Sequence, residues 1–213
     1  MAANSSNSLA KYLSKRAVDG PWQISGTERR DYPAVVVIPV LAEAESLPQT
    51  LQALATNPSE FLDRTLILTV VNNRQDASAA EKAANRRTLA WLQTRPWPQL
   101  QLAWIDAAGP ERELPAREGV GLARKIGFDL ALPRLAWQQP ALLISLDADT
   151  LVDDNYLPAL VAHFEQSTAG ACVLPFRHQT GTTAAQEKAI RGYELYLRSY
   201  LLGLRLAGSP YAY

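Results

Sequence analysis

Two acidic residues in the second half of the chain have the spacing of a metal-binding pair. Asp147 and Asp149 are separated by a single residue and come directly after the apolar run LLISL. Carboxylates at positions i and i+2 of a strand end can project into one crevice, and their hard oxygen atoms suit Mg²⁺ or Mn²⁺. A cation held there would neutralise the charge on a departing nucleoside diphosphate. The alternative is a solvated turn, in which Asp153 or Asp154 caps the helix that follows.

Polar residues also follow the earlier apolar runs of the chain. Glu43 and Glu45 come after AVVVIPV, and Asn72 and Asn73 come after TLILTVV. Neighbouring parallel strands bring their carboxyl ends to one edge of a sheet, where open α/β sheets bind their ligands. We therefore expect these side chains to share one rim with the acidic pair. His178, which follows a later apolar run, is a further candidate for this rim, from which it could reach a phosphate or the metal.

The apolar patterns between these residues predict alternating strands and helices. Residues 34–40 and 65–71 are compact β-branched runs, which are typical of strands buried on both faces of a parallel sheet. The intervening segments have apolar residues at helical spacing and many strong helix formers. This alternation is the signature of right-handed βαβ units. The predicted strands cover residues 34–40, 65–71, 101–106, 141–150 and 170–176, and the predicted helices cover residues 46–54, 79–95, 119–135, 154–166 and 184–207.

Four segments together give the chain a resemblance to the family 2 glycosyltransferases. They are VVVIPVLAE at 35–43, VVNN at 70–73, GLARKIG at 121–127 and LLISLDAD at 142–149, in the order of that family's motifs. The resemblance spans residues 34–175. It implies a GT-A fold, which is α/β with a Rossmann-like, mostly parallel sheet and helices on both faces. It also implies an enzyme that uses Mn²⁺ or Mg²⁺ to transfer a sugar, with inversion, from a UDP- or GDP-sugar donor to an unknown acceptor.

The resemblance further implies roles for single residues. Glu43 would lie at the nucleoside pocket, and Asn72 falls where the family usually has an Asp that hydrogen-bonds the base. Arg124 would lie near the base or the diphosphate. Asp147 would contact the ribose and share the metal with Asp149, which is its main ligand. His178 is a further candidate metal ligand.

The chain departs from the family pattern at several positions. Asn72 and Asn73 replace the usual acidic pair, and both stay candidates for nucleotide binding because an amide donates and accepts hydrogen bonds. The choice of base is therefore open. Lys125 stands where the family often has Asn, and Ala42 stands where it has the Asn before Glu. None of these changes removes the metal ligand.

The domain organisation expected from the sequence has three parts. Residues 1–30 form an N-terminal arm, residues 31–175 form the nucleotide-sugar-binding domain, and residues 176–213 form a long helix leading to a missing acceptor region. An inverting transferase needs a carboxylate base for the acceptor hydroxyl. No Asp or Glu follows Glu194. We therefore assign no catalytic base, and we expect the chain to end before the acceptor half and to bind donor without transferring the sugar.

The composition excludes some classes of protein. Among 213 residues, 21 Lys plus Arg balance 21 Asp plus Glu, so nothing forms the basic stripe that nucleic acids select. The single cysteine, Cys172, excludes an intrachain disulfide and is expected to be a small buried residue in a reducing compartment. The apolar runs fall far short of the roughly 20 residues of a membrane span. Without a signal core at the N-terminus, we expect a cytoplasmic protein, with peripheral membrane association left open.

Two other functions fit parts of the pattern. A phosphohydrolase of the haloacid dehalogenase type also has Asp-x-Asp after a strand. That family continues with Gly-Thr, whereas Thr150 follows Asp149 directly here, and its motif lies at the first strand. A non-catalytic module that binds a nucleotide sugar for a partner chain would explain the missing base.

Two further patterns have structural interpretations. The glycines of GVGLARKIG have the wrong spacing for a dinucleotide-binding loop, and they favour a helix start instead. Tyr193, Tyr196 and Tyr200 recur at helical spacing with Leu197, Leu201 and Leu204. We expect this stripe to be the packing face of a long helix.

Overall fold

The computed structural model describes residues 2–95 and 97–210, and it divides into two compact units. The first unit ends at Ser167 and the second begins at Thr168. Residue 1 of the predicted arm and residues 211–213 of the predicted terminal segment lie outside the described residues. No helix among the described residues is long and apolar enough to cross a bilayer.

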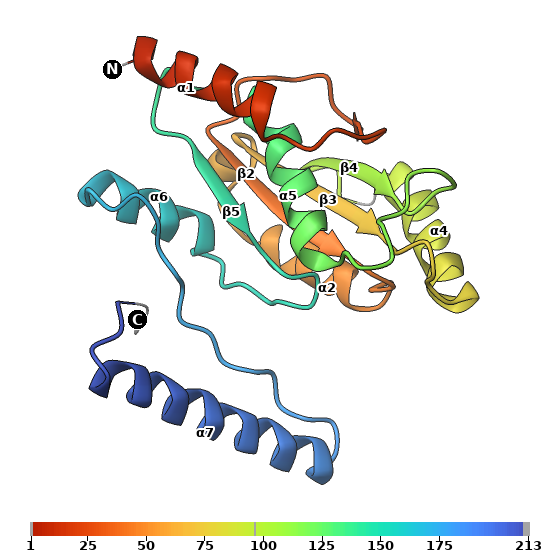
Figure 1. Cartoon of the computed structure of the whole chain (residues 1–213), viewed down its shortest axis with the longest axis vertical. Helices are drawn as coiled ribbons and strands as arrows, with labels where there is room; N and C mark the ends of the chain where they lie inside the picture. Colours follow the sequence, from red (N-terminus) through yellow and green to blue (C-terminus); the bar gives the residue numbers. More distant parts are fainter. Residues whose placement is uncertain (1, 96, 211–213) are drawn as a thin grey trace. The chain divides into compact units, whose positions relative to one another are not determined.

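The first unit is built on a five-stranded sheet with the order β1-β4-β3-β2-β5 (Figure 1). Strands β2 to β5 are parallel, and the two-residue β1 pairs antiparallel with β4. All residues of β2 and β3 are buried, as the β-branched runs predict. The strands are β1 (Ile24–Ser25), β2 (Ala34–Val40), β3 (Thr65–Asn72), β4 (Gln101–Ala107) and β5 (Leu142–Ser145).

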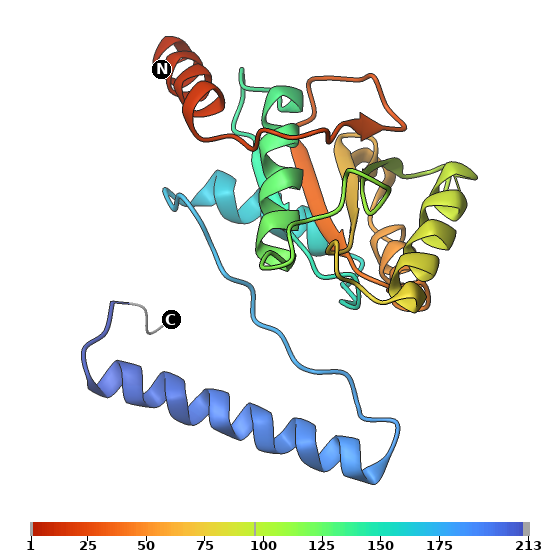
Figure 2. The ribbon, with the colours of Figure 1, turned by 45° about the vertical axis from the view of Figure 1, so that its right-hand side comes forward.

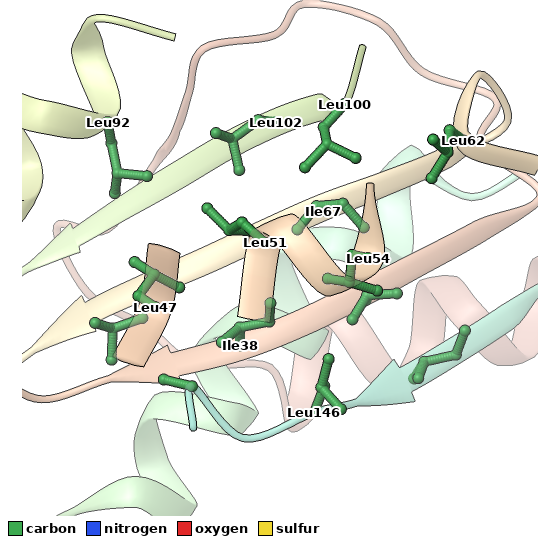
Figure 3. Packing of buried hydrophobic residues seen from close by; sticks show 14 of the residues in the cluster. Ile38, Leu47, Leu51, Leu54, Leu62, Ile67, Leu92, Leu100, Leu102 and Leu146 are labelled. Carbon is green, nitrogen blue, oxygen red and sulfur yellow. The ribbon is translucent and has the colours of Figure 1, made fainter. Parts of the chain in front are cut away.

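Helices cover both faces of this sheet, which confirms the predicted fold class (Figure 2). One hydrophobic core joins the sheet to α2, α3, α4 and α6, with Leu47, Leu51 and Leu54 of α2 lying over β2 and β3 (Figure 3). A second core joins the opposite face to α5. The helices of this unit are α1 (Ala2–Lys15), α2 (Ser46–Leu54), α3 (Ser59–Leu62), α4 (Ala79–Gln93), α5 (Val120–Ala131), the short 3₁₀ helix η1 (Leu132–Arg134) and α6 (Tyr156–Gln166).

The strand order reverses between β2 and β5. From β2 the chain steps outward to β3 and β4, and it then returns to place β5 on the other side of β2. Open α/β sheets bind ligands beyond the carboxyl ends of the strands where the order reverses in this way. In this protein that point lies beyond Val40 and Ser145, directly before the acidic pair.

A glycine allows α5 to lie close against the sheet. A Cβ built on Gly127 would come within 2.3 Å of Val37 Cγ1 and 3.0 Å of Val70 Cγ2. Any larger side chain would push the helix away from β2 and β3. The predicted helix-start role is filled by Gly119, which is the N-cap of α5, whereas Gly127 serves the contact between helix and sheet.

The N-terminal segment packs on α5. Asp129, which is 3% exposed, accepts hydrogen bonds from Tyr12 Oη and from the Val18 backbone N–H, both at 2.8 Å. Lys125 Nζ donates to Asp129 at 2.6 Å and to the carbonyl of Arg16 at 2.7 Å. Since the hydrogen bond to Asp129 favours the charged amine, the pKa of Lys125 is raised. The arm is thus fastened to the helix that carries Arg124.

The second unit consists of residues 168–183, which form no helix or strand, and α7 (Ala184–Leu206). The predicted strand over residues 170–176 is wrong, because these residues pair with no strand among the described residues. The expectation that Cys172 is buried is also wrong, since it is exposed. Tyr193, Tyr196 and Tyr200 are more than half exposed, so the predicted packing face is uncovered.

Candidate functional site

The acidic pair lies in a turn just beyond the last paired residue of β5. The Leu146 N–H donates to the carbonyl of Val37 at 3.1 Å, which continues the attachment of this segment to β2. Leu146 and Ala148 are buried, whereas Asp147 and Asp149 are exposed. A turn begins at Asp147, because the Thr150 N–H donates to the carbonyl of Asp147 at 3.1 Å. Both acidic residues are therefore exposed at the end of β5 and are not part of the core.

Two side chains from the α2 region hold this acidic segment in place. Thr50 Oγ1, which is buried in α2, donates to the carbonyl of Ala148 at 2.7 Å. Asn57 Nδ2 donates to the carbonyl of Asp153 at 3.2 Å, while Asn57 Oδ1 accepts from the Leu157 N–H at 2.8 Å. Asn57 therefore caps α6 from a distant part of the chain. The alternative in which Asp153 or Asp154 caps this helix is wrong, because its N-cap residue is Asn155, which makes no side-chain cap bond.

Arg124 of α5 pairs with the first of the two carboxylates. Its Nη2 donates to Asp147 Oδ1, which joins α5 to the segment after β5. The pair is partly open to solvent, so its own contribution to stability is small. Arg124 Nε is buried and has no hydrogen-bond partner among the described residues. The guanidinium thus has an unused donor beside the acidic pair.

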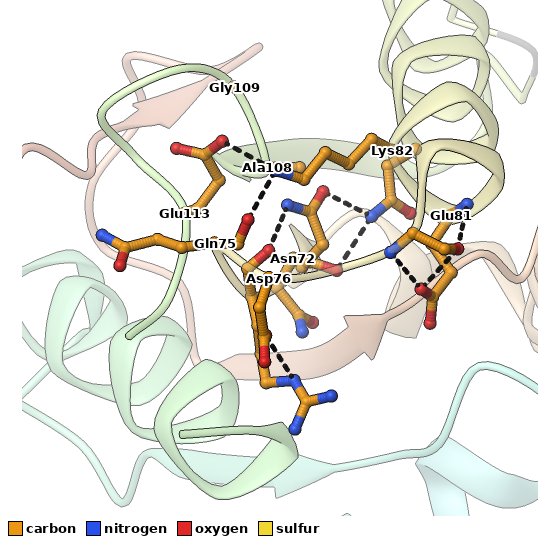
Figure 4. A network of polar contacts seen from close by, with 12 residues as sticks. Asn72, Gln75, Asp76, Glu81, Lys82, Ala108, Gly109 and Glu113 are labelled. Carbon is orange, nitrogen blue, oxygen red and sulfur yellow. Dashed lines mark hydrogen bonds and ion pairs between the residues drawn. The ribbon is translucent and has the colours of Figure 1, made fainter. Parts of the chain in front are cut away.

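A buried asparagine that the sequence did not single out joins the ends of β2 and β3. Asn85, fully buried in α4, accepts from the Ala42 N–H at 2.9 Å. Its Nδ2 donates to the carbonyl of Asn72 at 2.9 Å and to Asn73 Oδ1 at 3.0 Å. Asn73 Nδ2 in turn donates to the carbonyl of Arg74 at 3.1 Å. Figure 4 shows this network at the carboxyl end of β3.

Asn72 has a buried acceptor without a partner. Asn72 is 3% exposed, and its Oδ1 makes no hydrogen bond to any described residue. Residues two apart on a strand project to the same face. Leu68 and Val70 pack into the core that α5 covers, so Asn72 projects toward the α5 face of the sheet. A buried unsatisfied polar atom costs about 1–3 kcal/mol, which a ligand could offset by bonding to it.

The loop between β2 and α2 places Glu43 on the same edge. Ala42 has φ +57°, a left-handed conformation that a side chain with Cβ seldom adopts and that Asn tolerates better. The turn brings Glu43, half-buried, to the start of α2, where its carbonyl accepts from the Leu47 N–H at 3.0 Å. Glu45, the N-cap of α2, is exposed and makes no side-chain cap bond.

The loop after β4 is fastened to the end of β3. The Leu114 N–H donates to the carbonyl of Asn73 at 2.9 Å, and the Gln75 N–H donates to the carbonyl of Leu114 at 2.9 Å. Lys82 Nζ reaches the carbonyl of Gln75 at 2.7 Å and lies 3.6 Å from Glu113 (Figure 4). These bonds hold the β3 and β4 side of the rim together.

Two residues singled out by the sequence have other partners in the structure. Lys125 points to the N-terminal arm and bonds Asp129, although its neighbour Arg124 faces the acidic pair. His178 belongs to the second unit, where its Nδ1 lies 3.1 Å from Glu194 Oε1. The hydrogen bonds from His178 lower the pKa of Glu194. A role for His178 at the metal stays a prediction.

The residues present suit a metal that a substrate helps to bind. Among the described residues, no group of three or more His, Cys, Asp or Glu side chains is placed to hold an ion. Asp147 and Asp149 therefore offer at most a two-carboxylate site. Mg²⁺ is commonly held by one or two carboxylates together with substrate phosphates and water, so the site fits a metal that arrives with a diphosphate.

Comparison with known proteins gives two distant structural neighbours. No protein-family model matches the chain, and no curated protein matches it in sequence. The chain is similar to S. aureus TarS 1-349, with 15% identity and a TM-score of 0.37, over 67% of this chain and 38% of that one. It is also similar to the mannosyltransferase PcManGT from Pyrobaculum calidifontis, solved with GDP-Man and Mn²⁺, with 20% identity and a TM-score of 0.36, over 75% of this chain and 39% of that one.

The chain spans about two fifths of the length of these two structures. At identities and TM-scores this low, the likeness carries no argument about which molecules this protein binds. The function is therefore inferred from the residues at the carboxyl ends of β2, β3 and β5.

Proposed function

We propose that this chain is the donor-binding part of a GT-A glycosyltransferase of the family 2 type. The proposed reaction is the transfer of a sugar, with inversion, from a UDP- or GDP-sugar to an acceptor whose identity is open. One observation supports this proposal most: Asp147, Arg124 and Asn72 come from three different elements at the edge where the strand order reverses. Such an edge is the usual ligand site of open α/β sheets.

Asp149 and Asp147 would hold the Mn²⁺ or Mg²⁺ ion that accompanies the donor. When bound, the ion would neutralise negative charge on the diphosphate leaving group. The chain supports this role by holding the acidic segment rigidly, since Thr50 bonds the carbonyl of Ala148 between the two carboxylates. Rigid placement matters because a ligand that is already oriented loses less entropy when the donor binds.

Arg124 would bind the diphosphate or the base side of the nucleotide. Its ion pair with Asp147 orients the guanidinium, and its buried Nε keeps one donor unused. A guanidinium is suited to phosphate oxygens because its planar array of donors can make two parallel bonds. The unpaired Nε is the donor that we assign to the nucleotide.

Asn72 would recognise the nucleobase through its unpaired Oδ1. Uracil and guanine both present a ring N–H next to a carbonyl, so both can donate to this oxygen. The side chain of Asn73 already makes hydrogen bonds to Asn85 and to the carbonyl of Arg74, so it would shape the pocket more than contact the base. Glu43, at the adjacent turn, would line the nucleoside pocket.

The test is calorimetric titration of the chain with UDP and with GDP, each with and without Mn²⁺. We expect one of the nucleotides to bind in a Mn²⁺-dependent manner, and we expect Asp149→Ala to abolish that dependence. Asp154→Ala removes an exposed carboxylate just outside the acidic pair and serves as the matched control. Metal-dependent binding that survives unchanged in Asp149→Ala would refute the assignment.

A turnover assay with the cognate nucleotide sugar separates an enzyme from a binding module. Slow metal-dependent hydrolysis of the donor by this chain would support the transferase. Binding without any hydrolysis or transfer, also in a chain extended beyond residue 213, would favour the module that presents a nucleotide sugar to a partner.

A further inference from the structure

One carboxylate of the proposed metal site is already paired with a cation of the chain. Arg124 Nη2 donates to Asp147 Oδ1, so the guanidinium lies on a carboxylate that the proposed function assigns to the metal. A guanidinium neutralises part of the charge of this carboxylate, and two cations that share one carboxylate repel each other. Arg124 and a divalent ion are therefore competing partners of Asp147.

This competition matters because the chain offers few other metal ligands. In the part of the chain that the structure describes, no three His, Cys, Asp or Glu side chains lie close enough together to hold an ion. While Arg124 keeps Asp147, the acidic pair has at most one carboxylate for a metal. An ion held by so few protein ligands depends on substrate phosphates and water for the rest. We therefore expect a metal that arrives alone to bind weakly.

The guanidinium is the partner of this pair that can move. Thr50 Oγ1 donates to the carbonyl of Ala148 at 2.7 Å. The Thr150 N–H donates to the carbonyl of Asp147 itself at 3.1 Å, so the backbone of the acidic turn is fixed on both sides. The Arg124 side chain, by contrast, is long, has many rotamers and is 34% exposed. An exchange of partners therefore needs only a rotation of the Arg124 side chain.

We propose that Arg124 couples the binding of the metal to the binding of the donor diphosphate, an inference that rests on the proposed function. Arg124 Nε, which is buried and has no partner among the described residues, gives the phosphate a first donor while the ion pair is still closed. Arg124 then exchanges Asp147 for phosphate oxygens, to which a guanidinium can make two parallel hydrogen bonds. Asp147 becomes available to the metal. Because linkage is reciprocal, metal and nucleotide each strengthen the binding of the other.

Binding of Mn²⁺ alone to the full chain tests the competition, with the free ion measured by electron paramagnetic resonance. Arg124→Met removes the cation from Asp147 and should strengthen the binding of Mn²⁺ about two- to fivefold, the range expected from the loss of a partly exposed ion pair. Arg117→Met removes the same charge from an exposed position before α5 and should leave the affinity unchanged. Equal affinities of the native chain and Arg124→Met, including no binding by either, would overturn the proposal.

A double-mutant cycle assigns the effect to this ion pair. In a chain that already has Asp147→Asn, adding Arg124→Met should give no gain in Mn²⁺ affinity, because the guanidinium no longer has a carboxylate to release. A gain of the same size there, or an equal gain in Arg117→Met, would show a response to net charge alone and would contradict the proposal. Circular dichroism reports whether each variant folds, and Arg124→Gln repeats the test with a smaller neutral side chain.

Titration with UDP and GDP separates this inference from the proposed function. In the native chain, the nucleotide that binds should raise the affinity for Mn²⁺, and in Arg124→Met this increase should be smaller by about two- to fivefold. Native chain that binds neither nucleotide in a Mn²⁺-dependent manner would refute the proposed function itself. Mn²⁺-dependent binding in which Arg124→Met keeps the full native increase would refute only the coupling through Arg124.

Discussion

Replacing Asn85 with Ala should loosen the edge of the sheet that carries the proposed site. Asn85 is fully buried, and in the proposal it contacts neither the nucleotide nor the metal. Its amide joins the turn after β2 to the end of β3 through Ala42, Asn72 and Asn73. The substitution removes the amide but leaves the backbone of α4 intact, since Ala is a good helix former.

The expected cost follows from the three hydrogen bonds that Asn85 makes. A typical intramolecular hydrogen bond contributes about 1 kcal/mol net, so their loss lowers the free energy of unfolding by about 3 kcal/mol. The Ala42 N–H, the Asn72 carbonyl and Asn73 Oδ1 would each lose a partner near the crevice. A domain is typically stable by about 5–15 kcal/mol, so the variant should still fold.

Urea unfolding followed by tryptophan fluorescence measures this change. All five tryptophans, at positions 22, 91, 97, 104 and 137, lie in the first unit, so the signal reports that unit. Asn155→Ala is the matched control, because Asn155 is exposed and makes no cap bond; it should change stability by less than about 0.5 kcal/mol. An Asn85→Ala variant as stable as this control would refute the network's role.

Three further predictions concern α5 and the N-terminal arm that packs on it. In the same urea assay, Gly127→Ala should destabilise the first unit by about 1–3 kcal/mol, because the new Cβ would overlap Val37. Gly121→Ala should instead stabilise the unit by about 0.5–1 kcal/mol, because its Cβ would meet nothing within 4 Å. Equal effects of the two substitutions would contradict the close contact. Asp129→Asn should free the arm, so that trypsin cleaves at Lys15 and Arg16 much faster than in the native chain, and unchanged cleavage would show that Asp129 does not hold it. The pKa of Lys125 is raised in the fold, so its charged amine stabilises the attachment of the arm fully below the ordinary lysine pKa of about 10.4. This stabilisation is lost as the pH rises through the raised pKa. Protection of the arm from trypsin should therefore persist at neutral pH and fall in strong alkali.

The central strands could be predicted from the sequence because their burial leaves a direct signature. AVVVIPV and TLILTVV contain almost no polar residue, which a strand tolerates only when both faces are covered, and both form strands at the predicted places. The run GACVLPF has a similar composition but forms no strand. A strand depends on a neighbour to pair its backbone, and composition does not reveal whether a neighbour exists.

The candidate site could be predicted only in part. Asp147, Asn72 and Glu43 could be predicted because each follows a strand, and parallel strands bring their carboxyl ends to one edge of the sheet. The residues that fix this edge, Asn85 and Asn57, are polar residues in helical or loop segments that resemble surface positions. Their hydrogen bonds join residues up to 100 positions apart, so local spacing carries no sign of them.

The capping of α6 illustrates the same limit. Local rules favour Asp153 or Asp154 as the cap, but the Leu157 N–H bonds Asn57 instead. The N-terminal segment is a second example, because a polar stretch before a helix predicts a loose arm. Its attachment depends on Asp129, a buried carboxylate on α5 that looks like an ordinary surface charge in the sequence.

The central claim is that the crevice beyond β2 and β5 holds a divalent cation together with a nucleotide. Paramagnetic broadening of NMR signals by Mn²⁺, in the presence of the nucleotide that binds, tests it most directly. The side-chain signals of Arg124 Nε and Asn72 should broaden first. The indole of Trp137, which bonds the carbonyl of Leu132 near the amino ends of the strands, should stay sharp. Equal broadening at Trp137, or none at Arg124 and Asn72, would contradict the account.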